Sequence, residues 1–328
     1  MNVLAAVIAT LCFAARVSWA TDSAHAKECQ LQRLGSIDFA IVQNQVMVPV
    51  TVNNHAARMQ LDTSDIATVL SGDYAKWLGV GTHPLPGSAV VNFGKTRITQ
   101  IATAASFSVG SVKFGKGEFF LVPHAESGPI TENEPAIGVL GLNVFGKVDF
   151  ELDFANAKLN LYSQDHCPGV VVYWTDKYSS ARITQGPLGN YYFPMELDGR
   201  KIESTITTIT DGNSITTDVT RHLYNFDEKS EGIETETDPT GRSQSHYRAM
   251  ALTGDGIRIT NARMRLVVEK LPNCSLTSSR GSEHAAIYEG CMGGEAPLKL
   301  GLSVARHLHL YFATKEKVLY FSDASASK

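Results

Sequence analysis

The chain has 328 residues, of which 43% are apolar and 19% are charged, so it can bury the cores of two domains of ordinary size. Its formal net charge of −4 argues against the basic surface that nucleic acids or anionic membranes require, and we expect neither as a partner.

The chain begins with the features of a secretory signal. Residues 3–15 form an apolar run, and Ser18 and Ala20 place small residues at the spacing that signal peptidase requires. We therefore expect residues 1–20 to be a signal peptide, residues 21–35 to be a lead segment, and the mature protein to be secreted or periplasmic. The weak positive charge before the run leaves an uncleaved anchor open, although the run is shorter than the ~20 residues of a membrane span.

Short apolar segments, alternating or rich in β-branched residues, follow along the chain and are separated by Gly, Asn and Asp. This pattern is typical of strands joined by turns, and it predicts a mostly β fold. The expected strands lie at 37–42, 46–52, 90–93, 105–109, 119–122, 148–154 and 159–162. Helical periodicity is limited to one or two turns at a time, and the polar segment 227–247 is expected to be a loop.

The first half of the chain carries one motif whose residues could take part in catalysis. Asp62-Thr63-Ser64 follows an apolar strand, and Thr68 comes four residues after Ser64. Two carboxylates on such turns can share one proton and activate a water between them, because like charges about 3 Å apart cannot both ionise cheaply. The neighbouring hydroxyls would hold the loop, so we expect Asp62 to be catalytic and Thr63, Ser64 and Thr68 to support it.

The second half of the chain repeats the first. Leu140-Gly141-Leu142 recurs as Leu300-Gly301-Leu302, and the same offset pairs Phe150 with Leu310 and continues through the segments that follow. Because the repeated unit has the size of a domain, the repeat predicts two related lobes rather than a solenoid. The predicted units are a first lobe at 36–166, a crossover at 167–187 and a second, degenerate lobe at 188–328.

The second copy departs from the first where a second carboxylate would lie. One alignment places Thr207 over Asp62 and another places Thr210 there, so a Thr stands at the position in both. Asp211 is one residue away in the second alignment, and a slip of one residue in an extended segment turns a side chain to the opposite face. Asp211-Gly212 is also typical of a turn, so Asp211 is a doubtful second catalytic residue and Thr210 a supporting one.

Together these motifs resemble the retropepsin-like and pepsin-like aspartic protease superfamily. The resemblance rests on Asp62-Thr63-Ser64, on residues 139–145 and on the closing Leu159-Asn160-Leu161-Tyr162. It is good over residues 36–163 and weaker over residues 188–323. It implies an acid-protease-like fold of two β-barrel lobes related by a pseudo-two-fold axis, with a cleft between the lobes, Asp62 at its floor and a flap hairpin over it near residues 90–96.

Two functions follow from the resemblance. The first is an exported aspartic-type endopeptidase that hydrolyses peptides or unfolded proteins with an Asp62-activated water. A Thr hydroxyl cannot share an acidic proton, so this requires Asp211 from a shifted loop, or Asp62 from a second copy of the chain. The second is a catalytically inactive homologue that binds an extended peptide or a protein partner in the same cleft by β-pairing. The oligomeric state stays open.

Neither function needs a cofactor or a metal. His307 and His309 lack a third ligand and are expected at the surface, and no serine-hydrolase, nucleotide-binding or zinc-protease motif occurs. Removal of the signal leaves an even number of cysteines, which favours disulfides in an oxidising compartment. The predicted pairs are Cys29–Cys167 and Cys274–Cys291, one for each lobe; a zinc site lacks the Cys-x-x-Cys spacing.

Overall fold

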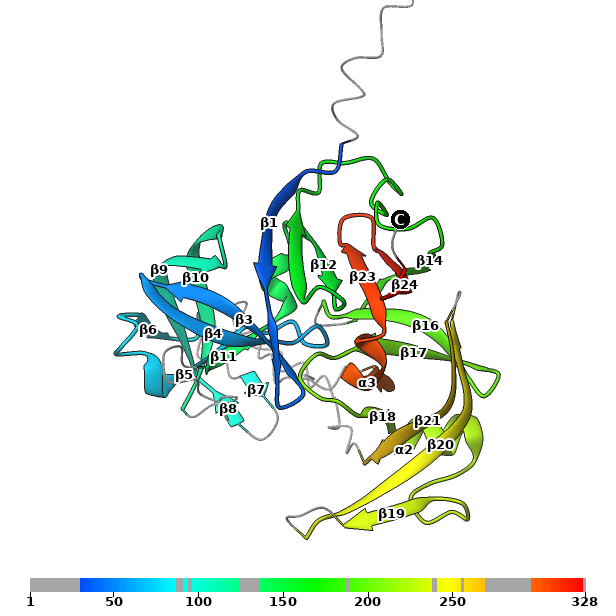
Figure 1. Ribbon diagram of the computed structural model, residues 1–328. Coiled ribbons are helices and arrows are strands. Elements are labelled where there is room, and N and C mark those ends of the chain that lie inside the picture. Colours follow the sequence, from blue (N-terminus) through cyan, green and yellow to red (C-terminus); the bar gives the residue numbers. More distant parts are fainter. Residues whose placement is uncertain are drawn as a thin grey trace, which may run out of the picture.

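The computed structural model describes residues 30–326, except 87–90, 94–95, 124–135, 187–188, 238–240, 255–256 and 269–295. The described chain is built mainly of β-strands arranged in two lobes with a shared sheet between them, as Figure 1 shows. The predicted all-β, two-lobed fold is therefore confirmed. The predicted signal peptide lies outside the described residues, as do Cys29, Cys274 and Cys291, so both disulfide pairings stay predictions.

The first lobe is an eight-stranded sheet that closes on itself through an additional pairing of β3 with β9. In sheet order its strands are β2 (Ala40–Val42), β3 (Gln45–Val52), β4 (His55–Leu61), β11 (Ala136–Leu140), β5 (Val69–Ser71), β10 (Val112–Val122), β9 (Gln100–Val109) and β6 (Gly81–Pro84). β3 and β4 form a hairpin whose turn residues, Asn53 and Asn54, both have positive φ. Asn tolerates this conformation better than most residues, which fixes the register of the hairpin.

The second lobe repeats this sheet strand for strand, and the predicted duplication is confirmed. Its order is β15 (Thr184–Gln185), β16 (Tyr191–Leu197), β17 (Arg200–Ile206), β22 (Leu298–Leu300), β18 (Asn213–Thr216), β21 (Ile257–Val267), β20 (Ser243–Gly254) and β19 (Glu234–Thr237), closed by β16 and β20. The β16–β17 turn again consists of two residues with positive φ, Asp198 and Gly199. Equivalent turns give the two hairpins the same register and the same buried faces.

A six-stranded sheet joins the lobes. Its order is β1 (Arg33–Asp38), β13 (Lys158–Tyr162), β12 (Asp149–Asp153), β23 (Leu308–Ala313), β24 (Val318–Asp323) and β14 (Ser179–Arg182). β12 and β23 are antiparallel neighbours at its centre, where Glu151 lies opposite Tyr311. These two residues are equivalent in the repeat, so the pseudo-two-fold axis passes between them. Phe150 and Phe312 stack across this centre with ring centroids 4.4 Å apart.

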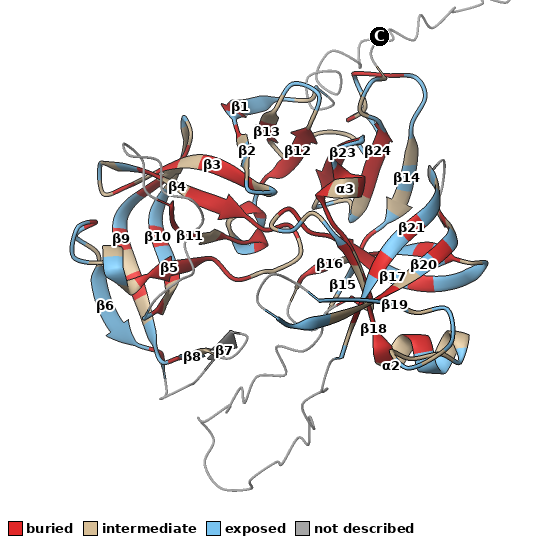
Figure 2. Ribbon diagram, turned by 60° about the horizontal axis from the view of Figure 1, so that its bottom comes forward, coloured by how far each residue is buried: buried red, intermediate tan, exposed pale blue. Residues whose placement is uncertain are grey.

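Buried residues run along the strands that face the lobe interiors, as Figure 2 shows for β3, β4, β12 and β24. Phe150 and Leu310, which the repeat pairs, are both fully buried. Alternation of apolar and polar residues decides which face of each strand enters the core, so equivalent residues are buried in both lobes.

The remaining elements are short. They are the 3₁₀ turns η1 (Gly72–Tyr74) and η3 (Leu142–Phe145), the helical turns α2 (Thr217–Val219) and α3 (Leu302–Ala305), the π-helical turn η4 (Thr220–Tyr224), and the hairpin strands β7 (Val91–Phe93) and β8 (Thr96–Ile98). None of the described helices is long and apolar enough to cross a membrane. The β7–β8 hairpin occupies the position in the sequence where a flap was predicted.

Two expectations were wrong. Segment 227–247, expected to be a loop, contains β19 and the beginning of β20. Its side chains are polar because β19 is exposed along its whole length, so the usual alternation is missing. His309, expected at the surface, is 5% exposed and is paired with the buried carboxylate of Glu151.

Candidate functional site

The candidate site begins where β4 ends. The backbone N–H of Asp62 donates to the carbonyl of Leu140 at 3.0 Å, which extends the β4–β11 pairing by one residue and fixes the turn that follows. β4 lies between β3 and β11 inside the sheet, so this turn starts from a buried strand. Asp62 is 4% exposed.

The carboxylate of Asp62 is held by its own loop and by the other lobe. Its Oδ1 accepts the backbone N–H of Ser64 at 2.8 Å and the Ser64 hydroxyl at 2.7 Å. The hydroxyl of Thr207, from the second lobe, lies 3.4 Å from the same oxygen. Burial raises the pKa of Asp62, while the hydrogen bonds from Ser64, the positive charge of Lys299 and the Thr207 hydroxyl oppose this rise.

Two threonines lock the lobes together around this carboxylate. The Thr63 hydroxyl donates to the carbonyl of Ile206 at 2.6 Å, and the Thr208 hydroxyl donates to the carbonyl of Leu61. The backbone N–H of Thr63 also donates to the Thr208 hydroxyl, at 3.3 Å. All four residues are buried, so these hydrogen bonds form away from water and hold the two loops in fixed positions.

This reciprocal pattern identifies the residue equivalent to Asp62. Leu61 and Thr63 flank Asp62, and Ile206 and Thr208 flank Thr207 in the same way. Of the two alignments that the sequence left open, the structure selects the one that places Thr207 over Asp62. The position of a second carboxylate is therefore filled by a hydroxyl, which can donate a hydrogen bond but cannot hold an acidic proton.

Equivalent glycines, Gly141 and Gly301, pack closely against the loops of the two lobes. The backbone N–H of Gly141 donates to the Thr68 hydroxyl, and that of Gly301 donates to the side-chain oxygen of Asn213, each at 3.0 Å. A Cβ on Gly141 or Gly301 would lie only 2.4 or 2.5 Å from a carbonyl oxygen of the facing loop. Only glycine allows this close approach, which explains why the Leu-Gly-Leu sequence occurs in both halves.

The structure does not bring Asp211 to Asp62. Arg306 forms an ion pair with the Asp211 carboxylate, and both side chains are about two-fifths exposed, at 40% and 41%. No hydrogen bond among the described residues connects Asp211 with Asp62. Thr210 is exposed, and its carbonyl accepts the backbone N–H of Leu302 at 2.9 Å.

Two charged residues near Asp62 were not predicted from the sequence. Asp65 lies in the same loop; burial raises its pKa, the negative charge of Asp62 raises it further, and a hydrogen bond from the Ala67 N–H opposes both. Lys299 on β22 lowers the pKa of Asp62 and Asp65 through its positive charge. Nothing in the sequence distinguishes Asp65 from other loop residues. The one sequence signal for Lys299 is that a charged residue stands where the first copy has the apolar Val139.

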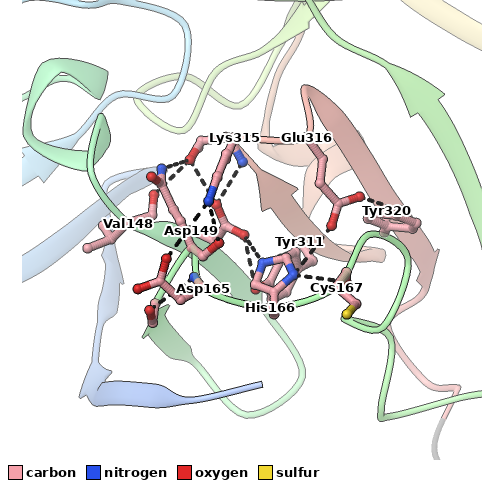
Figure 3. Close-up of polar contacts among 12 residues, drawn as sticks. Val148, Asp149, Asp165, His166, Cys167, Tyr311, Lys315, Glu316 and Tyr320 are labelled. Carbon is pink, nitrogen blue, oxygen red and sulfur yellow. Dashed lines mark hydrogen bonds and ion pairs between the residues drawn. The ribbon is translucent and has the colours of Figure 1, made fainter. Parts of the chain in front are cut away.

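A second buried polar cluster lies on the shared sheet, away from this loop. In Figure 3 the His166 ring lies between Asp149 and Glu316, with Nε2 2.6 Å from Asp149 and Nδ1 3.4 Å from Glu316. Within the part of the chain that the structure describes, no group of three or more His, Cys, Asp or Glu residues could hold a metal ion. Asp149 also accepts hydrogen bonds from Thr314, so the cluster connects β12 with the second half of the shared sheet.

Replacing Asp62 with Asn is expected to change how stability depends on pH. A carboxyl whose pKa is raised by folding supplies stability that is fully present below its unfolded value near 4 and is lost as the pH rises through its folded pKa. From about pH 4 upward, Asp62→Asn should therefore become more stable than the wild type. The difference should reach about 1.4 kcal/mol for each unit by which folding raises the pKa of Asp62. Urea unfolding between pH 3.5 and 7 measures this.

The matched control is Asp211→Asn, which removes an exposed carboxylate from a surface ion pair. Such pairs contribute at most about 1 kcal/mol, so the control should be less stable than wild type by no more than that at pH 7. If the stability of the wild type and of Asp62→Asn depended on pH in the same way, the inference that the Asp62 carboxylate is buried would be wrong.

Comparisons with known proteins give a limited result. No family model and no curated protein matches this sequence. Among solved structures, an aspartic proteinase from Irpex lacteus is similar, with 12% sequence identity and a TM-score of 0.49; the match covers 89% of this chain and 98% of that chain. Independently of this likeness, the strand order and register described above establish a two-lobed, duplicated all-β fold.

Proposed function

We propose that this protein is a non-catalytic relative of the aspartic proteases that binds an extended polypeptide between its lobes. The proposal rests on one observation: the Thr207 hydroxyl occupies the position of a second carboxylate and lies 3.4 Å from Asp62 Oδ1. A water between Asp62 and Thr207 would face one carboxylate and one hydroxyl, and a Thr hydroxyl cannot share an acidic proton. Both lobes have the strands and the loop that hold the site, but the second lobe has a threonine at the position of the paired acid.

The β7–β8 hairpin supplies a surface for such a ligand. Among the described strands, β7 and β8 pair only with each other, so neither has a second strand beside it. Figure 1 shows the hairpin at the lower end of the first lobe, on the side of the second lobe. An extended peptide could add to this edge through main-chain hydrogen bonds, with little dependence on its sequence.

The endopeptidase is the second candidate, because Asp62 is retained and its burial raises the pKa, as a proton-sharing acid requires. A dimer that pairs Asp62 with Asp62 of a second copy would have to displace Thr207. It would also break the hydrogen bonds of Thr63 and Thr208 to the opposite lobe. These contacts make the binding function the better supported one. Export of the mature protein stays a prediction.

Hydrogen exchange tests the binding proposal directly. With a reduced and alkylated model protein as ligand, at pH 7, we expect slower exchange of backbone amides in residues 91–98 and in the loop 62–68. β19 is an edge strand of the second lobe, exposed along its whole length, and serves as the internal control, since its exchange should stay unchanged. Protection confined to β19, or no protection at all, would refute binding between the lobes.

A further inference from the structure

A cavity of about 440 Å³ lies in the second lobe, separate from the loop of Asp62. It is a pocket open to solvent on one side, between the β16–β17 hairpin and the β23, β24 and β14 half of the shared sheet. Its floor is apolar and buried, and the main contributors are Phe193, Met195, Ile206, Leu310, Leu319 and Phe321. Apolar surface of this kind is normally covered by other side chains, so an open pocket with an apolar floor needs an explanation.

The repeat explains how one side of the cavity arises. In the first lobe Ile37 lies opposite Leu159, and in the second Ala181 lies opposite Leu319, the equivalent of Leu159. Ile37 is 2% exposed and packs so closely that a Cβ on Gly110 would meet it at 2.6 Å. Ala181 lacks the branched chain that fills this space in the first lobe, and it lines the cavity instead.

A second replacement changes the wall of the same space. Val109 lies opposite Val50 in the first lobe, and the register of β16 with β20 makes Gly254 the equivalent of Val109. A Cβ on Gly254 would lie only 2.6 Å from the Met195 sulfur, so the Met195 side chain occupies the place of the missing side chain. Met195 replaces Val50 and gives the pocket an unbranched and flexible wall. The unfilled space therefore lies on the side of Ala181.

The rim of the cavity is charged. Arg182, Lys201 and Glu196 line it and are exposed. Glu196 lies directly opposite Lys201 in the β16–β17 pair, so these two charges offset one another. Arg182 forms no ion pair with any other residue that the structure describes. A positive guanidinium at the mouth of an apolar cavity favours a ligand with an anionic group at one end.

We propose that this cavity binds one amphipathic small molecule, an unbranched apolar chain with a carboxylate head group. The chain occupies the space left by Ala181, against the flexible side chain of Met195, and the carboxylate meets Arg182 at the rim. The volume lies within the range of about 300–1,000 Å³ that small-molecule sites show, and an apolar lining with few polar groups is typical of them. The site is distinct from the cleft and does not depend on the function proposed for it.

Calorimetric titration of the full chain with dodecanoate, below its micelle concentration, tests this. We expect saturable binding of one molecule per chain, and weaker binding of the uncharged dodecanol. Arg182→Gln should weaken dodecanoate binding roughly fivefold and leave dodecanol unchanged, as expected for an exposed charge pair. Arg200→Gln, an exposed arginine of the same lobe outside the cavity, is the control and should change neither affinity.

Ala181→Ile tests the cavity itself by introducing the residue of the first lobe. It should reduce dodecanoate affinity more than tenfold while the circular dichroism spectrum stays native, and Ala40→Ile in the first lobe should leave the affinity unchanged. Binding of several molecules per chain, wild-type affinity in Ala181→Ile, or equal losses for dodecanoate and dodecanol in Arg182→Gln would each overturn the proposal. The Arg182 comparison decides the question even if Ala181→Ile fails to fold.

Discussion

Thr207→Asp is expected to make stability fall steeply as the pH rises. The introduced carboxylate would lie beside Asp62 in a site where Thr207 is 1% exposed, and two buried carboxylates at this distance cannot both ionise cheaply. With one pKa raised by about three units, the variant loses on the order of 4 kcal/mol between pH 4 and pH 7. As the pH falls towards 4 the pair takes up a shared proton, so most of this loss should vanish.

Chemical denaturation across this pH range measures the effect, and Thr210→Asp is the matched control. Thr210 is exposed in the same loop, so a carboxylate there should change stability by less than about 0.5 kcal/mol at any pH. Thr207→Asp also restores a pair that can hold one proton near pH 3–6, and we expect acid peptidase activity to appear in this variant. A pH profile like that of the control would show that Thr207 does not face Asp62.

Asp149→Ala is expected to cost about 3–5 kcal/mol of stability, because it removes the centre of a buried charged network. Asp149 is fully buried; its Oδ1 accepts the backbone N–H and the hydroxyl of Thr314, both at 2.8 Å, and its Oδ2 lies 2.6 Å from His166. The contacts with Thr314 join β12 to the β23–β24 turn. Without Asp149 the buried ring of His166 loses its acceptor, and both halves of the shared sheet are weakened.

Asp165→Ala provides the comparison for that loss. Asp165 belongs to the same region but is exposed and lies 3.8 Å from Lys315, a distance at which a surface ion pair contributes less than about 1 kcal/mol. Thermal or urea unfolding at pH 7 compares the two variants. Similar stabilities for Asp149→Ala and Asp165→Ala would mean that the Asp149 network does not hold the lobes together.

The fold could be predicted because its signals are local and occur twice. Asn53-Asn54 and Asp198-Gly199 mark equivalent hairpin turns, and the repeated Leu-Gly-Leu segment marks the strands that close each loop. β19 could not be predicted, since a strand exposed along its whole length lacks the alternation that a buried face imposes. The burial of His309 depends on Glu151, a partner far away in the sequence, and no local pattern shows that contact.

The candidate site could be predicted in part. Asp62 stands in a recognisable motif, but the choice between Thr207 and Thr210 as its equivalent needed the hydrogen bonds of Thr63 and Thr208 across the lobes. The proximity of Lys299 to Asp62 is likewise a product of the tertiary fold. Sequence patterns describe each loop separately, whereas the chemistry of the site depends on how two distant loops meet.

A cleavage assay tests the central claim most directly. The purified protein is incubated with a reduced and alkylated protein at several values between pH 3 and pH 6, and the products are analysed by mass spectrometry. Because Thr207 stands where a second carboxylate would be, we predict that the substrate stays intact throughout this range. Fragments that appear with the wild type, and that disappear with Asp62→Asn or with a statine-type transition-state mimic, would contradict the account and establish a peptidase.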